Sequence, residues 1–132
     1  PDVSENITVR SIVGNFLEHS RIFYFLNGEN EEIYCGSADW MPRNLERRVE
    51  ILFPVEEPRL KEKLQDILSA QLRDNVKAQI LQPDGTYAKV DKRGKERFGS
   101  QEYFCREAQR EAREAAQETG SGSRRFVPEI HR

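Results

Sequence analysis

The residues best suited to chemistry lie in one short stretch, where a histidine and an arginine stand two positions apart. His19 comes where an apolar helical pattern stops and a run of strand-forming residues starts. Because alternate residues of an extended segment point to the same side, the side chains of His19 and Arg21 would face one common space. An imidazole can carry a proton near neutral pH, and a guanidinium binds phosphate oxygens in pairs. Together the two side chains favour phosphate chemistry.

Further polar residues are expected close to this pair, because a predicted hairpin returns the chain to the same place. Its second arm ends at Gly36 and Ser37, and the Ser37 hydroxyl is suited to donate to a phosphate oxygen. Arg43, Arg47 and Arg48 follow within one short segment and could bind a polyanion. Ligand sites of small α/β units tend to lie at strand ends, which is where these residues fall.

Each candidate also has an ordinary structural interpretation. His19 would interact with the last carbonyls of a helix. Arg21 would form a salt bridge with Glu18 or Glu32. The Ser37 hydroxyl would satisfy a turn, and the arginines after it would form a solvated face. For any one residue the ordinary interpretation is the stronger, but several anion-binding groups around one strand end favour a site.

The sequence gives less support to a metal site or to a nucleophilic cysteine. Asp39, Glu46 and Glu50 have no spacing that specifies a metal ion. Cys35 and Cys105 are too few for a disulfide framework or a structural zinc site. Cys35 falls in a predicted strand, and Cys105 has no histidine near it in sequence.

The composition suits one domain, since 132 residues can build a real core but leave little room for two. Charged residues make up 33% and the net charge is −2, which argues against a basic nucleic-acid binder. No apolar run approaches the length of a membrane span, and no signal-peptide pattern opens the sequence. We expect a reduced, cytoplasmic protein, with peripheral membrane attachment left open. Because the sequence starts at Pro1 without a methionine, we expect it to be cut from a longer protein.

Two predicted elements flank His19. Before it, a helix is predicted to follow the capping residues Ser4-Glu5-Asn6, because apolar residues recur at helical spacing. These residues are Val9, Ile12, Val13, Phe16 and Leu17. After it, the segment from Arg21 to Leu26 is aromatic and β-branched on both faces, which predicts a strand covered on both sides. The turn signal Asn27-Gly28 and a second strand from Glu32 to Ser37 complete an antiparallel hairpin.

Downstream of the hairpin, the segment from Asp39 to Asn44 is predicted to be a loop or short turn, anchored by burial of Trp40 and Met41. Alternation from Val49 to Val55 predicts a strand with an inner face, and Pro54 should mark its end or an edge position.

The next elements continue the alternation of helix and strand. Pro58 begins a helix whose apolar stripe runs from Leu60 to Leu72. A short strand from Val76 to Leu81 ends at the turn Pro83-Asp84-Gly85, and the segment from Tyr87 to Val90 is expected to pair back.

The character of the chain changes after residue 90. The segment from Asp91 to Gly99 is charged and contains glycines, which predicts a loop or linker. Gln101 to Glu118 predicts a helix with a thin apolar face, and Thr119 to Ser123 is a flexible Gly/Ser stretch before a tail. We therefore expect one domain over residues 1–90, and a charged linker, weak helix and flexible tail over residues 91–132.

Several separated motifs resemble the C-terminal catalytic domain of bacterial polyphosphate kinase. The motifs are Ser4-Glu5-Asn6-Ile7, Ser11-Ile12-Val13, Phe16-Leu17-Glu18-His19-Ser20-Arg21-Ile22, Gly36-Ser37-Ala38-Asp39-Trp40-Met41-Pro42-Arg43-Asn44 and Arg47-Arg48-Val49-Glu50. The resemblance runs from about Ser4 to about Leu81, and the spacing of several motifs makes it specific. It implies that residues 1–90 are a phospholipase D-like catalytic domain, an α/β fold with a mixed sheet flanked by helices.

The resemblance implies an ATP:polyphosphate phosphotransferase, which moves the terminal phosphate of ATP reversibly to polyphosphate. His19 matches the essential histidine of the family's last domain, whereas the phosphorylated histidine belongs to a preceding domain that is absent here. His19 would then be a general acid/base or a phosphate-stabilising partner. Arg21 would neutralise charge on the transferring phosphoryl group, and Ser37 would donate to a phosphate oxygen. Arg43 and Arg48 would line the polyphosphate path.

The same resemblance implies the partners of the chain. They are ATP or ADP, polyphosphate, the preceding domains of the same enzyme, and further copies in a homo-oligomer of the full-length protein. Mg²⁺ would arrive with the nucleotide, since no carboxylate pair here specifies an ion held by the protein. We expect no nucleic acid, no transmembrane segment and no activity from the chain alone.

The chain departs from the phospholipase D pattern at and after the histidine motif. That pattern has His-x-Lys and an Asp further on, whereas this chain has His19-Ser20-Arg21 and then Tyr24-Phe25-Leu26. Arg21 would replace the lysine as a phosphate clamp, and the departure argues against a simple phosphodiesterase. Two alternative functions stay open. A phospholipase D-type phosphodiesterase would turn over a phosphodiester, and a non-catalytic module would bind polyanions without depending on His19.

Overall fold

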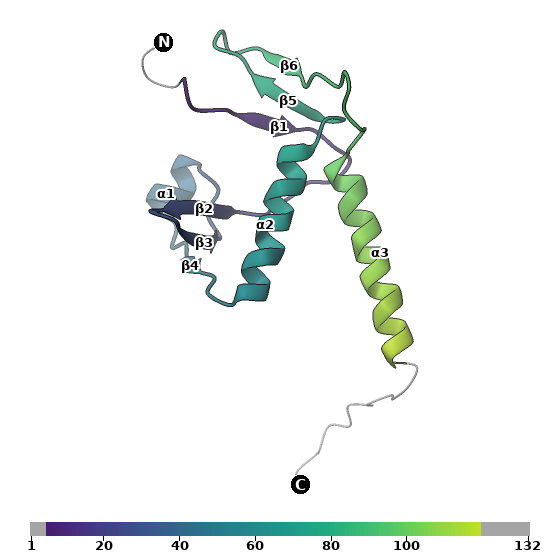
Figure 1. Cartoon of the computed structure of the whole chain (residues 1–132). Coiled ribbons are helices and arrows are strands. Elements are labelled where there is room, and N and C mark those ends of the chain that lie inside the picture. Colours follow the sequence, from purple (N-terminus) through teal and green to yellow (C-terminus); the bar gives the residue numbers. More distant parts are fainter. Residues whose placement is uncertain (1–4, 120–132) are drawn as a thin grey trace. The chain divides into compact units, whose positions relative to one another are not determined.

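The computed structural model describes residues 5–119 of the chain. The chain divides into two compact units, Pro1–Ser100 and Gln101–Arg132 (Figure 1). The described part of the first unit contains six strands and two helices, which confirms the predicted α/β fold class. Ser4, predicted to help cap a helix, and the Gly/Ser stretch and tail after Thr119 lie outside the described residues. The expected domain boundary after residue 90 stays a prediction.

Three strands of the first unit form an antiparallel sheet in the order β1-β5-β6. β1 (Arg10–Ile12) pairs with β5 (Ala78–Leu81), and β5 pairs with β6 (Tyr87–Lys89). The turn between β5 and β6 contains Gly85 with φ of 84°, a left-handed conformation that suits a residue without a Cβ. The strand predicted around Val76–Leu81 and its returning partner are therefore confirmed.

The prediction of a helix before His19 is wrong. This part of the chain forms the short strand β1, and residues 13–21 form a loop. The β-branched residues here favour an extended backbone, and β5 supplies hydrogen-bond partners, so strand pairing prevails over the helical spacing of the apolar residues. The pairing extends beyond β1, since the Leu81 N–H donates to the Val9 carbonyl at 3.0 Å. Val13, Phe16 and Leu17, expected to form a buried stripe, are exposed.

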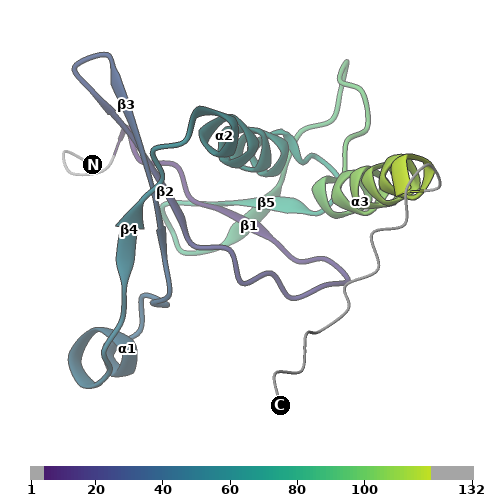
Figure 2. The ribbon, with the colours of Figure 1, turned by 90° about the horizontal axis from the view of Figure 1, so that it is seen from below.

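The predicted hairpin is confirmed. β2 (Ile22–Asn27) and β3 (Asn30–Gly36) are antiparallel neighbours. The turn residues Gly28 and Glu29 have φ of 57° and 71°, and positive φ at both positions is the mark of a tight hairpin turn. β4 (Leu52–Pro54) pairs with β3 and completes a second sheet in the order β2-β3-β4 (Figure 2).

Two predictions about burial in this second sheet are wrong. β2 is not covered on both faces, because Tyr24, Phe25 and Leu26 are exposed. The strand expected over Val49–Val55 shortens to β4, and its expected inner face is exposed as well. The expectation that Pro54 ends the strand is confirmed. Among the described residues of this sheet, only Ile33 has a fully buried apolar side chain. A chain of this length has few other elements that could cover both faces of the sheet.

The connection between β3 and β4 contains α1 (Pro42–Arg47). Pro42 starts this helix in its first turn, where a missing N–H and a fixed φ do no harm. The predicted anchoring of the connection by burial of Trp40 and Met41 is wrong, because Trp40 is 79% exposed and Met41 is also exposed. The buried residue of α1 is Asn44.

The helix predicted to begin at Pro58 is confirmed as α2 (Pro58–Arg73). Glu57 caps it, since its carboxylate accepts the Leu60 N–H at 2.8 Å. α2 contacts the hairpin through Gln65, whose Nε2 donates to the Glu31 carboxylate at 2.8 Å.

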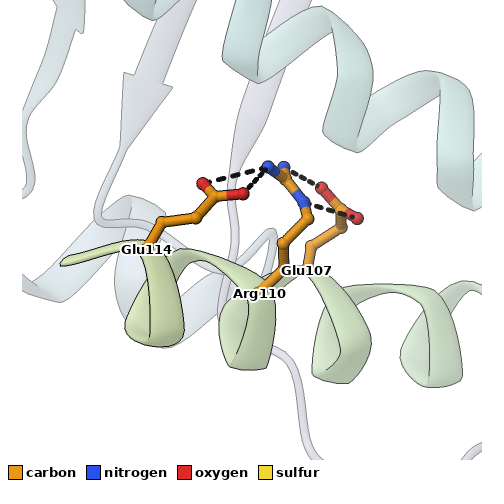
Figure 3. A network of polar contacts seen from close by, with 3 residues as sticks. All are labelled: Glu107, Arg110 and Glu114. Atoms are coloured by element: carbon orange, nitrogen blue, oxygen red, sulfur yellow. Dashed lines mark hydrogen bonds and ion pairs between the residues drawn. The ribbon is translucent and has the colours of Figure 1, made fainter. Parts of the chain in front are cut away.

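α3 (Ser100–Thr119) begins at the last residue of the first unit and continues through the described part of the second, which confirms the helix predicted over Gln101–Glu118. Arg110 lies between two carboxylates on its surface and donates to Glu107 at 2.6 Å and to Glu114 at 2.9 Å (Figure 3). Such pairs, three and four residues apart, support a helix whose apolar face is thin. Over residues 5–119, none of the helices combines the length and the apolar character that a membrane span requires.

Candidate functional site

The predicted pair of His19 and Arg21 meets a third residue, Asp39. Arg21 Nε donates to Asp39 Oδ1 at 3.0 Å, and Arg21 Nη2 donates to the same oxygen at 2.6 Å. Arg21 directly precedes β2 and Asp39 follows β3, so the ion pair joins the two ends of the hairpin. The side chains of Arg21 and Asp39 are 24% and 40% exposed, so the pair is partly shielded from water.

Arg21 also contacts the main chain of His19. Its Nη1 donates to the His19 carbonyl oxygen at 2.9 Å. His19 is exposed in the loop between β1 and β2, so its interpretation as a histidine at a helix end is wrong. Arg21 does form a salt bridge, as its structural interpretation predicted, but its partner is Asp39 and not Glu18 or Glu32.

We call four residues of this region the His19 cluster, because the charges of the other three act on Asp39: His19, Arg21, Asp39 and Arg43. The hydrogen bond from Arg21 lowers the pKa of Asp39 below its usual range, although partial burial opposes this. The positive charges of Arg21, Arg43 and His19 lower the pKa of Asp39 further. Asp39 is therefore ionised at neutral pH, and charges from two segments of the chain act on it, the loop before β2 and α1.

Ser37 lies at the end of β3, but its hydroxyl is already engaged. Ser37 Oγ donates to Glu50 at 2.5 Å and accepts the Ile51 N–H at 3.0 Å. The hydroxyl thereby helps to join the end of β3 to the segment before β4. It would have to leave Glu50 in order to donate to a phosphate.

The predicted arginines do not all reach the same place. Arg43 stands in the first turn of α1, exposed, and acts on the charge of Asp39. Arg48 follows α1, is also exposed, and is not among the charges that act on Asp39. The structure thus brings Arg43 to the His19 cluster and leaves Arg48 outside it.

Packing around Gly36 and Trp40 fixes the segment that carries Asp39. A Cβ on Gly36 would lie 3.3 Å from both the Phe23 ring and the Leu52 side chain, closer than side chains usually approach. Glycine is needed here for the close approach of the protein's own neighbouring strands. The Trp40 ring stacks on Phe23 with centroids 6.2 Å apart and an interplanar angle of 22°.

Sequence reasoning considered Asp39 only as a metal ligand and missed its role beside Arg21. One signal was available, because the hairpin register brings the residue before β2 opposite the end of β3. The structure shows this in the hydrogen bond from the Gly36 N–H to the Arg21 carbonyl at 3.0 Å. An acidic residue just after β3 is therefore within reach of a basic residue just before β2.

The described residues contain no group of three or more His, Cys, Asp or Glu side chains that could hold a metal ion. Two carboxylates of this region are engaged, Asp39 by Arg21 and Glu50 by Ser37.

Comparison with known proteins shows the family to which the chain belongs. Residues 1–101 match the family model described as "Polyphosphate kinase C-terminal domain 2". The chain belongs to the polyphosphate kinase family. A polyphosphate kinase of Synechocystis sp. is 66% identical over 86 residues, covering 65% of this chain and 12% of that protein. A polyphosphate kinase of Lactiplantibacillus plantarum is 47% identical over 128 residues, covering 96% of this chain and 18% of that protein.

A solved structure supports the same family. The crystal structure of polyphosphate kinase from Porphyromonas gingivalis is similar with a TM-score of 0.76 and 39% sequence identity. The likeness covers 84% of this chain and 17% of that one. The chain thus has the fold of one part of a polyphosphate kinase, and it spans less than a fifth of the length of these relatives.

Proposed function

We propose that this chain is the C-terminal part of a polyphosphate kinase that transfers the terminal phosphate of ATP reversibly to polyphosphate. The chain supplies the His19 cluster as one half of an active site, and a preceding domain supplies a histidine that becomes phosphorylated. Membership of the family supports the activity. The observation that supports the assignment of the site is the ion pair of Arg21 with Asp39 at the ends of one hairpin, with Arg21 bonded to the main chain of His19 and with the charge of Arg43 acting on Asp39.

The proposed reaction has two phosphoryl transfers. In the first, a nitrogen of the upstream histidine bonds to the γ-phosphorus of ATP, the bond from that phosphorus to the β,γ-bridging oxygen breaks, and ADP leaves. In the second, a terminal oxygen of polyphosphate bonds to the phosphorus and the P–N bond breaks. His19 gives a proton to, or takes one from, the leaving or attacking oxygen. Proton transfer by a positioned side chain typically contributes about 10²–10⁴-fold in rate.

Arg21 acts on the transferring phosphoryl group in this proposal. A guanidinium has five N–H donors. Three of them are used, two by Asp39 and one by the His19 carbonyl. One N–H remains on Nη1 and one on Nη2, and the two can bind phosphate oxygens in the manner typical of arginine. Positioning and charge stabilisation supply most of the catalysis in phosphoryl transfer.

The other predicted site residues have smaller roles. Arg43 contributes positive charge to the His19 cluster and binds polyphosphate. Ser37 donates to a phosphate oxygen after its bond to Glu50 exchanges. Arg48 contacts a more distant part of the polyphosphate chain.

Mg²⁺, which accompanies nucleotide phosphates, does not fit the residues of the described part of the chain as a resident ion. Its preferred ligands are oxygens in octahedral geometry, and Asp39 already binds a guanidinium. We therefore propose that Mg²⁺ arrives with ATP, and no step of this chain's residues depends on it.

The proposed partners are ATP or ADP, polyphosphate, the preceding domains of the enzyme and further copies in a homo-oligomer. We propose a cytoplasmic enzyme, with any membrane attachment peripheral.

The decisive experiment compares polyphosphate synthesis from ATP by the 132-residue chain and by the chain joined to its upstream sequence, called the full-length enzyme below. We expect activity only in the full-length enzyme. Polyphosphate binding by both proteins without synthesis by either would favour a non-catalytic module. Turnover of a phosphodiester by the chain alone would favour a phosphodiesterase.

The role of His19 is tested by His19→Ala in the full-length enzyme. We expect a loss of about 10²-fold or more in transfer from ATP to polyphosphate. Ser20→Ala, at the exposed neighbouring position, is the matched control and should retain full activity. If His19→Ala stays within a few-fold of the unmodified enzyme, the assignment of His19 is wrong.

A further inference from the structure

We infer that Asp39 is a positioning residue of the proposed phosphate site: it orients the Arg21 guanidinium and, through it, the main chain of His19. The inference rests on the proposed function and adds to it a carboxylate that touches no phosphate. Its basis is the chain of contacts from Asp39 to Arg21 to His19.

The geometry fixes the plane of the guanidinium. One carboxylate oxygen, Asp39 Oδ1, accepts both Nε and Nη2 of Arg21 at 3.0 and 2.6 Å. Two hydrogen bonds along one edge prevent the guanidinium from turning about its last side-chain bond. The third bond, from Nη1 to the His19 carbonyl, then sets the distance between Arg21 and the main chain of His19.

Asp39 is itself held on both sides along the chain. Before it, the Ser37 N–H donates to the Ile51 carbonyl at 3.0 Å. After it, the Met41 N–H donates to the Asp39 carbonyl at 2.7 Å, and Trp40 stacks on Phe23 of β2. The carboxylate is thus tied to the sheet that also carries Arg21, so it can serve as a fixed reference for a long and otherwise mobile side chain.

The carboxylate has a second consequence, because it lies between cationic groups. It neutralises part of the positive charge of Arg21, Arg43 and His19, which would otherwise repel one another in one small region. The cluster can then keep two guanidiniums close to a titratable imidazole before a phosphate arrives. Misplacement of a catalytic group by about 1 Å can cost about 10²-fold in rate. The placement of Arg21 and His19 by Asp39 should therefore affect turnover more than substrate binding.

The test uses Asp39→Ala and Asp39→Asn in the full-length enzyme, with steady-state kinetics of polyphosphate synthesis. We expect kcat to fall about tenfold or more in Asp39→Ala while KM for ATP changes by less than about threefold. Asp39→Asn keeps an acceptor oxygen without the charge and should fall in between. Asp91→Asn is the matched control, because Asp91 also pairs with Nε and Nη2 of an arginine, Arg93, in an exposed loop. It should leave kcat unchanged.

A double-mutant cycle with Arg21→Ala separates positioning from mere structural support. If Asp39 acts through Arg21, Asp39→Ala should cost nothing further in kcat once Arg21 is already alanine. Fully additive losses, or an Asp39→Ala enzyme with unchanged kcat, would overturn the inference. His19→Ala is measured in parallel: if it is active, the proposed function fails, whereas an inactive His19→Ala beside unaffected Asp39 variants defeats this inference alone.

Discussion

The carboxylate of Asp74 accepts both the main-chain N–H and the hydroxyl of Ser100, at 2.7 and 2.9 Å. Asp74 and Ser100 are 1% and 0% exposed. The other carboxylate oxygen accepts the N–H groups of Val76, Lys77 and Ala78 at 2.9, 2.8 and 3.1 Å. An ionised group can be buried when its acceptor capacity is satisfied in this way. Asp74 therefore holds together the end of α2, the start of β5 and a residue 26 positions further along the chain.

We predict that Asp74→Asn destabilises the 132-residue chain strongly. The amide places an NH₂ group or an uncharged oxygen where the carboxylate accepts several N–H groups, so at least one buried donor loses its partner. The free energy of unfolding should fall by about 3 kcal/mol, measured by urea denaturation with circular dichroism. Asp84→Asn is the control, since Asp84 accepts the N–H and hydroxyl of Thr86 in an exposed turn. Equal losses in the two variants would contradict the prediction.

The same carboxylate should govern the stability of the chain in acid. Burial alone would raise the pKa of Asp74, but hydrogen bonds from Ser100, Lys77 and Val76 outweigh it and hold the pKa below its usual value. The folded state thus binds the proton more weakly than the unfolded state, whose Asp pKa is about 3.9. The stabilisation is present above that pH and is lost as the pH falls through the folded pKa. We expect the difference in free energy of unfolding between the unmodified chain and Asp74→Asn to become smaller as the pH falls, as measured by urea denaturation from about pH 6 to about pH 2. A difference that stays constant with pH would contradict this prediction.

In the hairpin turn, we predict a substitution that increases the free energy of unfolding. Glu29 has φ of 71°, a left-handed conformation that strains a residue with a Cβ. Glu29→Gly should relieve this strain and raise the free energy of unfolding by about 0.5–1 kcal/mol, partly offset by the greater freedom of glycine in the unfolded chain. Gly28→Ala, at the adjacent position with φ of 57°, should instead destabilise. The urea midpoints of the two variants would have to shift in opposite directions.

The hairpin could be predicted from the sequence because its signals are local. The dipeptide Asn27-Gly28 and the strand-forming residues beside it lie within a few positions of one another. The strand β1 could not be predicted in the same way, because its partner β5 lies about seventy positions further along the chain. The apolar residues at Val9 and Ile12 fit a helical spacing, but the pairing with β5 decides their conformation.

The candidate site shows the same division. His19 and Arg21 could be selected from residue type and alternation, since an extended segment places them on one side. Asp39 could not be selected in this way, because its contact with Arg21 depends on the register that brings the two ends of the hairpin together. The exposure of Trp40 was also beyond sequence reasoning, which assigns an aromatic residue beside a site to the core by default.

Arg43 and Arg48, which are both exposed, should differ in their effect on polyphosphate. Arg43 acts on the charge of Asp39, whereas Arg48 follows α1 outside the His19 cluster. A cation close to the phosphate path contributes more to binding, because Coulomb attraction falls with distance and charges beyond about one Debye length are screened by salt. In the full-length enzyme, Arg43→Ala should raise KM for polyphosphate about fivefold or more and weaken its dependence on salt, while Arg48→Ala should change KM by less than about twofold. Steady-state kinetics at two salt concentrations measure both effects. Equal effects of the two substitutions would mean that the path runs evenly along α1, and that the charge around Asp39 does not define where polyphosphate enters.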